Sequence, residues 1–458
     1  MNDWIPDLGA RDRPHYLAIA DLIAADIAAG RLRPGTRLPP QRRLAARLGI
    51  DFTTVARGYV EAKRRGLVDS RIGQGTFVRV PPASAALRPG ALPVDLSMNL
   101  PPEPDDPPLI HRMREGLAEI GGDIAALLRY QGFGGSPADK DAASIWLGRR
   151  GLVPSQDRVF VTPGAHPALL ALFGMFTAAG ETILCEAITY PGVRAITRQL
   201  GMRLVGVPMD AEGIVPEALE EACRRSAPKC LYLNPTLQNP TTITVPMARR
   251  AQIVEIARAA RIPIIEDDAY GFIPQHGPPP FAAMAADITW HVAGLAKCVG
   301  AGLRVAYVVA PSAKAGWPFA AALRAMTVMA APLTVALATR WIEDGTADQL
   351  LRFIRNETAA RQALAREALA GQHFRSDPLS FHLWLELPHP WTRSAFAGQM
   401  RATGIGVVPS DAFAADGAPG EAVRIGLGGP VSRAQLRSAL DYMAHALANP
   451  PDHDSAFF

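Results

Sequence analysis

The stretch that decides the fold of this chain is W-H-V-A-G-L-A-K-C-V-G-A-G-L-R-V-A-Y, from Trp290 to Tyr307. The apolar run from Ile288 to Ala296 predicts a buried strand, and Lys297 follows it directly, before a glycine-containing loop. A lysine at the end of a buried strand is poorly hydrated, so its amine loses proton affinity and can act as a nucleophile. Such an amine can form a Schiff base with an aldehyde cofactor. A surface lysine after a core strand is an equally good interpretation of this stretch alone.

The composition describes a globular protein of several domains. A chain of 458 residues is too long for one core, and 48% hydrophobic with 20% charged residues predicts two to four soluble domains. The start, M-N-D-W-I-P-D, lacks the order of a signal peptide, and no apolar run is long enough to span a bilayer. The four cysteines show neither metal-ligand spacing nor the density of a disulfide framework. We therefore expect a cytoplasmic protein with no metal site and no membrane partner.

Positive charge is concentrated at the N-terminal end. Residues 1–80 hold 14 Lys and Arg against 8 Asp and Glu, or +6, while the whole chain carries +4, which leaves −2 for the remainder. A small basic domain on a slightly acidic body predicts a nucleic-acid partner, and a solvated basic face is the simpler alternative.

Residues 12–80 predict a winged helix-turn-helix domain. The expected elements are helices over 14–27, 41–48 and 51–62 and strands around 67–70 and 76–78. In such a domain the third helix enters the major groove while basic side chains hold phosphates.

Three phrases in this domain resemble the GntR superfamily of bacterial regulators: I-A-A-G-R-L-R-P-G-T-R-L-P-P-Q-R-R-L-A, T-T-V-A-R-G-Y-V-E-A-K-R-R-G-L-V and G-Q-G-T-F-V. The resemblance implies binding to double-stranded DNA. The residues that it implies for DNA contact are Arg42, Thr53, Thr54 and Arg57 and, in the wing, Gly73, Gly75 and Thr76. Phe52 departs from the basic or polar residue usual at the start of the recognition helix, since it can contact a thymine methyl group but not a guanine edge.

The remainder of the chain predicts an α/β body after a linker. Residues 81–95 are rich in Pro, Ala and Gly and read as the linker, and the body over 96–458 begins with an arm at 96–108. Apolar runs between amphipathic helices predict a large domain over 109–330 with a mostly parallel sheet covered on both faces. Its expected strands are Val159–Thr162, Thr182–Glu186, Arg203–Met209, Cys230–Asn234, Pro263–Asp267, Thr289–Ala296 and Val305–Ala310. A small α/β domain over 331–448 is expected from strands at Phe381–Leu387, Gly406–Pro409 and Val423–Leu427.

Several polar motifs follow predicted strands, where ligands collect in an open α/β sheet. The turn Gly164–Ala165–His166 opens a helix and can offer backbone N–H groups to a phosphate, and Tyr190 can stack on a flat heterocycle. Asn239, in a proline-rich loop, can hydrogen-bond a phenolic oxygen. A turn or simple packing is the alternative for each. The strand end E-D-D-A-Y carries three carboxylates, which predict a cationic partner such as a protonated pyridine nitrogen, with capping or a metal as alternatives.

The order of these motifs resembles the fold-type I aminotransferases over 96–448. It runs from Tyr130 with G-F-G-G through G-A-H, T-Y-P-G, Q-N-P-T, E-D-D-A-Y and A-K-C-V-G-A-G-L-R to V-R-I-G-L-G. With its N-terminal domain, the whole chain resembles the MocR-type regulators, in which a GntR domain is fused to an aminotransferase-like body. The family implies pyridoxal 5′-phosphate as cofactor and a head-to-tail homodimer.

The resemblance implies a catalytic set of Lys297, Asp267 and Tyr270. Lys297 would hold the Schiff base, and Asp267 would pair the pyridine nitrogen, although Asp268 could take that role because the register within E-D-D is uncertain by one residue. Tyr270 and Asn239 would contact the ring hydroxyl.

The resemblance also implies how the rest of the cofactor and a substrate are held. Arg304 and the turn Gly164–Ala165–His166 would hold the phosphate, Tyr190 would stack on the ring, and Tyr130 would reach in from the partner subunit. Arg424 would clamp a substrate carboxylate with its planar guanidinium.

Two departures weaken the phosphate site. Family members commonly carry serines one and three residues before the lysine, where this chain has Ala296 and Gly294. Because a full set of cofactor-site residues is fused to a DNA-binding domain, we expect a regulator that senses the cofactor or an amino compound reacting with it, and a loosely held cofactor would suit such a sensor. A working aminotransferase with an accessory DNA-binding domain is the alternative, and a DNA-binding dimer with an inert body is the third interpretation.

Overall fold

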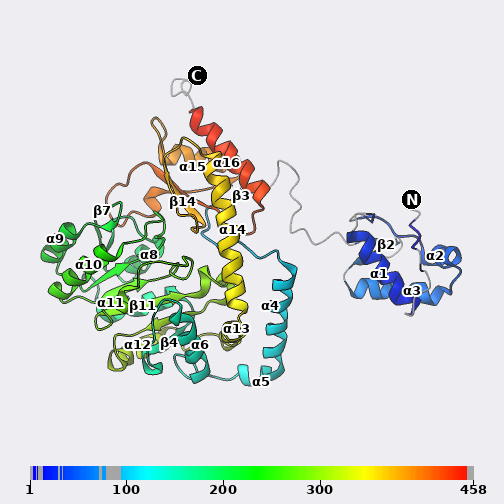
Figure 1. Cartoon of the computed structure of the whole chain (residues 1–458), viewed down its shortest axis with the longest axis horizontal. Helices are drawn as coiled ribbons and strands as arrows, with labels where there is room; N and C mark the ends of the chain where they lie inside the picture. Colours follow the sequence, from blue (N-terminus) through cyan, green and yellow to red (C-terminus); the bar gives the residue numbers. More distant parts are fainter. Residues whose placement is uncertain are drawn as a thin grey trace. The chain divides into compact units, whose positions relative to one another are not determined.

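The computed structural model describes residues 4–6, 8, 14–28, 31–32, 35–65, 67–71, 75–78 and 94–450. The chain divides into two compact units, Met1–Leu92 and Pro93–Phe458. Figure 1 shows both units, coloured by sequence from blue at the N-terminus to red at the C-terminus.

The N-terminal unit is a winged helix-turn-helix, as predicted. Its elements are α1 (His15–Ala28), α2 (Gln41–Leu48), α3 (Phe52–Arg64) and an antiparallel hairpin of β1 (Val68–Arg71) and β2 (Gly75–Val78). Gly49 ends α2 in the left-handed conformation, with φ of 64°, which glycine adopts without steric cost. The Asp51 side chain then caps α3 by accepting the Thr53 N–H at 2.8 Å. Ile19, Val55 and Tyr59 are among the side chains that form one buried core.

The second unit contains the predicted α/β body, built on a seven-stranded sheet of order β4-β12-β11-β10-β9-β5-β6. The strands are β4 (Val159–Thr162), β5 (Thr182–Glu186), β6 (Arg203–Val207), β9 (Cys230–Leu233), β10 (Ile264–Asp267), β11 (Thr289–Gly294) and β12 (Ala306–Val309). All neighbours are parallel except β12, which runs antiparallel to both β11 and β4. This mixed, mostly parallel sheet is the expected fold-type I architecture.

Helices cover both faces of this sheet because its strands are apolar on both sides. Val159, Val161 and Tyr307 pack into a core on one face, while Phe160 and Val308 pack into a separate core on the other. The helices of the large domain are α4 (Pro107–Ile120), α5 (Ile124–Leu127), α6 (Pro137–Gly148), α7 (Ala165–Phe176), α8 (Pro191–Gln199), α9 (Pro216–Ser226), α10 (Met247–Ala260), α11 (Phe281–Met284) and α12 (Ala313–Thr327).

Some predicted strands end early or are divided in the structure. Thr289–Ala296 ends at Gly294, and Gly406–Pro409 is divided between two short strands of separate sheets. The run Arg203–Met209 breaks after Val207, because Pro208 has no N–H with which to continue the ladder. The residues beyond it form β7 (Met209–Asp210), which pairs with β8 (Gly213–Ile214) outside the main sheet.

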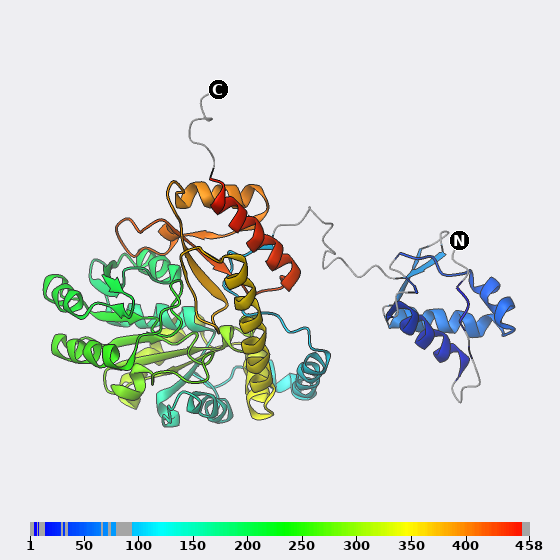
Figure 2. The ribbon, with the colours of Figure 1, turned by 45° about the horizontal axis from the view of Figure 1, so that its top comes forward.

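The small domain has a four-stranded antiparallel sheet of order β13-β14-β17-β16. Its elements are β13 (Phe374–Arg375), β14 (His382–Glu386), β16 (Val408–Pro409), β17 (Ala422–Gly426), α15 (Arg393–Ala402) and α16 (Arg433–Ala448). The long helix α14 (Thr346–Ala368) runs from α13 (Pro332–Glu343) to this domain, and α16 packs along it (Figures 1 and 2). None of the helices in the described ranges is long and apolar enough to cross a membrane.

The arm is attached to the small domain through its main chain. Strand β3 (Val94–Asp95) pairs in parallel with β15 (Ile405–Gly406), and the Gly426 N–H donates to the Leu96 carbonyl at 2.7 Å. A Cβ atom at Gly428 would lie 1.7 Å from the Leu100 carbonyl oxygen, so only glycine permits this approach. The residues after Leu96 are thereby carried past the sheet edge toward the large domain.

Candidate functional site

A cavity of about 580 Å³ lies beyond the carboxyl ends of the large-domain strands. It collects ten residues singled out from the sequence: Gly164, Ala165, His166, Tyr190, Asn239, Asp267, Tyr270, Lys297, Arg304 and Arg424. Residues separated by up to 260 positions thus line one space, with contributions from both domains of the body.

Lys297 occupies the position that the opening motif predicts. It ends a 3₁₀ turn, Leu295–Lys297, that follows β11, and its Nζ donates a hydrogen bond to the Asn99 carbonyl. Burial, together with the positive charge of Arg424, lowers the pKa of this amine to about 8, although Asp267 partly opposes the change. The amine is therefore far more available as a nucleophile than an exposed lysine.

Strand alternation separates the three carboxylates of E-D-D. Successive side chains of an extended segment point to opposite faces, so Glu266 and Asp268 share one face while Asp267 takes the other. Asp267 lines the cavity and Asp268 does not. The Tyr232 hydroxyl donates to Asp267 Oδ2 at 2.8 Å, and Oδ1 is buried with no partner among the described residues. Burial raises the pKa of Asp267 to about 6.

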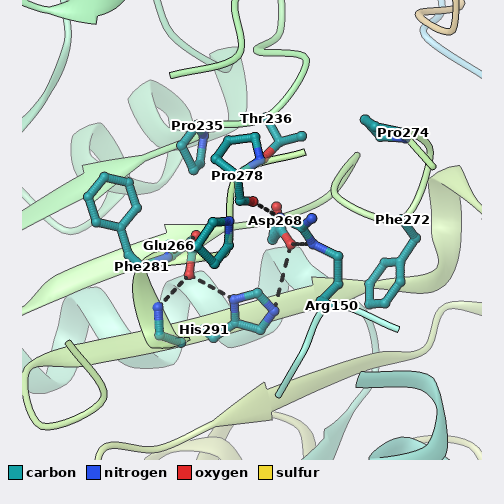
Figure 3. Close-up of polar contacts among 12 residues, drawn as sticks. Arg150, Pro235, Thr236, Glu266, Asp268, Phe272, Pro274, Pro278, Phe281 and His291 are labelled. Carbon is teal, nitrogen blue, oxygen red and sulfur yellow. Dashed lines mark hydrogen bonds and ion pairs between the residues drawn. The ribbon is translucent and has the colours of Figure 1, made fainter. Parts of the chain in front are cut away.

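The opposite face carries a buried network of charges (Figure 3). Asp268 accepts from Arg150 Nε at 2.9 Å, and Glu266 lies 2.9 Å from His291 Nδ1. Arg250, fully buried, contacts Glu266 at 3.4 Å. Although burial opposes it, the charges of Arg150 and His291 hold the pKa of Asp268 below its ordinary value. Asp268 Oδ1 is also buried without a hydrogen-bond partner among the described residues, but Asp268 does not line the cavity. The position of its side chain therefore favours Asp267 as the residue that faces a ligand.

One end of the cavity suits an anion. Gly164, with φ of 100°, caps α7, so the helix presents its N-terminal N–H groups and positive dipole end to the cavity. A Cβ at Gly164 would lie 3.1 Å from Arg304 Nη2, so the glycine lets the guanidinium approach the turn. Burial and the neighbouring Arg304 charge lower the pKa of His166. Gly294 and Ala296 also line the cavity but contribute no hydroxyl groups.

The other end presents a second cation. Arg424, on β17, donates from Nη1 to Asn239 Oδ1 at 2.9 Å and from Nη2 to the Ser97 carbonyl. Its Nε is buried without a partner among the described residues. Burial lowers the pKa of Arg424 to about 10, so the side chain stays charged at neutral pH. A carboxylate would satisfy this guanidinium with two parallel hydrogen bonds.

Two polar residues at the site were not predicted from the sequence: Asn99 lines the cavity, and His382 contacts Asn99 from behind it. Asn99 Nδ2 lies 2.9 Å from the Tyr270 hydroxyl and 3.1 Å from His382 Nδ1. Asn99 is the one amide in the arm, where all other residues except Ser97 are apolar, acidic or proline, and this is a signal that could have identified it. His382 begins a strand of the small domain and carried no such signal.

Tyr130 differs from the other candidates. Its side chain is 83% exposed and does not line the cavity. The resemblance to the aminotransferases implies that it reaches into the site of a partner subunit, and that assignment stays a prediction.

The DNA-contact candidates lie in and around α3. Thr53 and Thr54 are in its first turn, and Arg57 is exposed one turn later, with its guanidinium 4.3 Å from the Tyr16 ring centroid. Phe52 is 42% exposed at the helix start, and the Arg42 guanidinium lies 5.9 Å from its ring centroid.

The wing candidates are placed less favourably for contact. Thr76 is only 9% exposed, and Gly75, with φ of 113°, lies against the Arg37 side chain. Gly73 lies outside the described residues.

Comparison with known proteins agrees with this architecture. Residues 93–443 match the family described as aminotransferase class I and II. The chain belongs to that family. Residues 15–78 match the gntR family of bacterial regulatory proteins, so the chain is a helix-turn-helix transcriptional regulator with an aminotransferase-like body, the MocR-type combination expected from the sequence.

Three similar proteins illustrate the match. The HTH-type transcriptional regulator YdeF of Bacillus subtilis is 28% identical over 443 residues, which cover 95% of each chain. The vitamin B6 salvage pathway transcriptional repressor PtsJ of Salmonella typhimurium is 28% identical over 310 residues, or 64% of this chain and 67% of PtsJ. A crystal structure of an archaeal alanine:glyoxylate aminotransferase superposes with a TM-score of 0.72 at 23% identity, covering 79% of this chain and 92% of that one.

Proposed function

We propose that the body binds pyridoxal 5′-phosphate at Lys297 and that the protein regulates transcription in response to the cofactor or to an amino compound that reacts with it. The observation that carries this proposal is the cavity itself. A lysine with a pKa near 8, a buried carboxylate oxygen without a partner on Asp267 and the charged Arg424 all line the same space.

The residues present fit the cofactor group by group. The unpartnered Asp267 Oδ1 is suited to a protonated pyridine nitrogen, and the α7 N-terminus with Arg304 is suited to a phosphate. Tyr270 and Asn239 lie on the cavity wall, where they would contact a ring hydroxyl, and Tyr190 would cover one ring face. Bound there, the cofactor would supply an aldehyde carbon for amines and an electron-withdrawing ring.

The charges of the cavity support one class of effector. Arg424 is desolvated, its Nε has no partner among the described residues, and its Nη2 donates to the Ser97 carbonyl. A ligand carboxylate would accept from Nε and could replace the Ser97 carbonyl as the acceptor for Nη2. An amine placed between Arg424 and Lys297 would reach the reactive carbon of the cofactor. We therefore propose an amino acid or similar amino carboxylate as effector, double-stranded DNA as the macromolecular partner and a homodimer as the working form.

The decisive experiment reconstitutes the purified full-length protein with pyridoxal 5′-phosphate. The expected result is a visible absorbance band that Lys297→Ala abolishes, together with binding to the DNA upstream of its own gene that changes when the cofactor and candidate amino acids are added. Absence of any Lys297-dependent band would falsify the proposal.

A working aminotransferase is the competing function, because Lys297, Asp267 and Arg424 are all in place. Single-turnover conversion of the bound cofactor to pyridoxamine 5′-phosphate with a panel of amino acids distinguishes the two. Rapid, complete conversion with one amino acid and DNA binding that no ligand changes would favour the enzyme.

A further inference from the structure

We propose that Asn99 and His382 are a positioning pair that directs the hydroxyl proton of Tyr270 into the cavity, toward the phenolic oxygen of the bound cofactor. The inference rests on the proposed function, because the acceptor is the ring oxygen of pyridoxal 5′-phosphate. It is carried by an uninterrupted series of hydrogen bonds that begins at a backbone carbonyl.

The series starts at Gln238. Its backbone carbonyl lies 3.2 Å from His382 Nε2 and can only accept a hydrogen bond, so Nε2 carries the hydrogen. Burial, and then the positive charge of Arg424, lower the pKa of His382 to about 3, and Lys297 acts in the same direction. The imidazole is therefore neutral at physiological pH, and its Nδ1 bears a lone pair.

This lone pair fixes the orientation of the Asn99 amide. His382 Nδ1 lies 3.1 Å from Asn99 Nδ2, and an acceptor at this distance requires the NH₂ group to face it. The opposite amide orientation would place the Asn99 oxygen against the lone pair, with two acceptors facing each other. Ser380 Oγ lies 3.0 Å from the same Nδ1 and can also donate to it, but this does not change the orientation of the Asn99 amide.

The second hydrogen of the amide determines the role of Tyr270. Asn99 Nδ2 is also 2.9 Å from the Tyr270 hydroxyl, which must accept this hydrogen bond. A hydroxyl that accepts one bond keeps its own proton for another partner. Within the part of the chain that the structure describes, the Tyr270 hydroxyl has no protein acceptor, and Tyr270 lines the cavity with its ring centroid 6.0 Å from Lys297 Nζ.

A hydrogen bond donated to the ring oxygen has a measurable consequence. It stabilises negative charge on that oxygen, so the nitrogen that Lys297 contributes to the chromophore loses its proton at a lower pH. The other titratable groups facing Tyr270 are Arg424, Asp267 and Tyr190, and substitution of Asn99 leaves all three in place.

The test is a pH titration of the visible absorbance of the reconstituted full-length protein. Asn99→Ala is expected to raise the midpoint by about 0.5–1 pH unit, the size of one lost hydrogen bond, and Tyr270→Phe is expected to raise it at least as much. The deciding comparison is the double variant, in which Asn99→Ala should add nothing to Tyr270→Phe. Glu103→Gln, at an exposed position of the same arm, is the matched control and should leave the midpoint unchanged.

His382→Ala and Asn99→Ser are expected to shift the midpoint in the same direction, so the test does not depend on one variant folding. The inference is wrong if the absorbance band forms but the Asn99 and His382 variants leave its midpoint unchanged. It is also wrong if the effects of Asn99→Ala and Tyr270→Phe add in full. Those results leave the proposed function standing, whereas a wild-type protein with no band overturns both.

Discussion

The rate at which the protein captures pyridoxal 5′-phosphate is expected to rise as Lys297 loses its proton, near pH 8 rather than near 10.5, the ordinary pKa of lysine. Only the neutral amine attacks an aldehyde, and burial beside Arg424 disfavours the protonated form. At pH 7.5 about 24% of a group with a pKa of 8 is neutral, against about 0.1% of an ordinary lysine, so the reactive fraction differs roughly 240-fold.

The assay is stopped-flow absorbance of the cofactor-free protein mixed with pyridoxal 5′-phosphate between pH 6 and 9.5, with N-acetyl-lysine as the reference amine. The association rate constant should rise about tenfold per pH unit below the pKa and flatten above it. Arg424→Met should move the midpoint upward, because removing the positive charge favours the protonated amine. Lys314→Met, at an exposed lysine, is the control and should change nothing. A rate that parallels N-acetyl-lysine up to pH 9.5 would refute the reasoning.

Three further predictions concern affinity, stability and DNA binding. Restoring hydroxyls with Gly294→Ser and Ala296→Ser should tighten cofactor binding about five- to tenfold per hydrogen bond. A Cβ at Gly294 would lie 3.6 Å from the Ala165 Cβ, which leaves room for serine. Equilibrium dialysis measures the cofactor dissociation constant, and no tightening would contradict a weak phosphate site. Arg250→Met should lower the free energy of unfolding by roughly 3–5 kcal/mol, because it leaves Glu266 buried without its guanidinium partner. The control Arg258→Met removes a surface ion pair with Asp287 and should cost less than about 1 kcal/mol. Urea denaturation measures both variants, and equal effects would argue against a buried charge network. Phe52→Arg should strengthen binding to non-specific duplex DNA and increase the salt dependence by about one phosphate contact, as measured by anisotropy across salt concentrations; an unchanged slope would place the helix start away from the DNA backbone.

Much of the fold could be predicted from the sequence because its determinants are local. Apolar runs of four to six residues mark the buried strands, and Gly49 and Asp51 mark a helix boundary that needs no tertiary information. The exception at Pro208 is local as well, since a missing N–H ends a ladder wherever it occurs.

The site was predictable only in part. Lys297 and Arg424 belong to distinctive motifs, and the resemblance to the aminotransferases implies one shared site for them. The residues alone could not show that they line the same cavity. The choice between Asp267 and Asp268 depends on which face of β10 each side chain takes, and a shift of one residue in register reverses it. His382 lacks a motif because its role comes from a tertiary contact with Asn99. Long-range polar contacts of this kind leave no periodic pattern in the sequence.

The main-chain attachment of the arm has a practical consequence for dissecting this protein. Two of its acceptors in the cavity, the carbonyl oxygens of Ser97 and Asn99, persist whatever side chains stand at those positions. An alanine scan of the arm would therefore detect Asn99 through its side chain and leave the Ser97 contact invisible. Removing the DNA-binding domain by cutting after residue 96 would separate these carbonyls from the strand that holds them, so an isolated body intended for ligand studies should start before Val94.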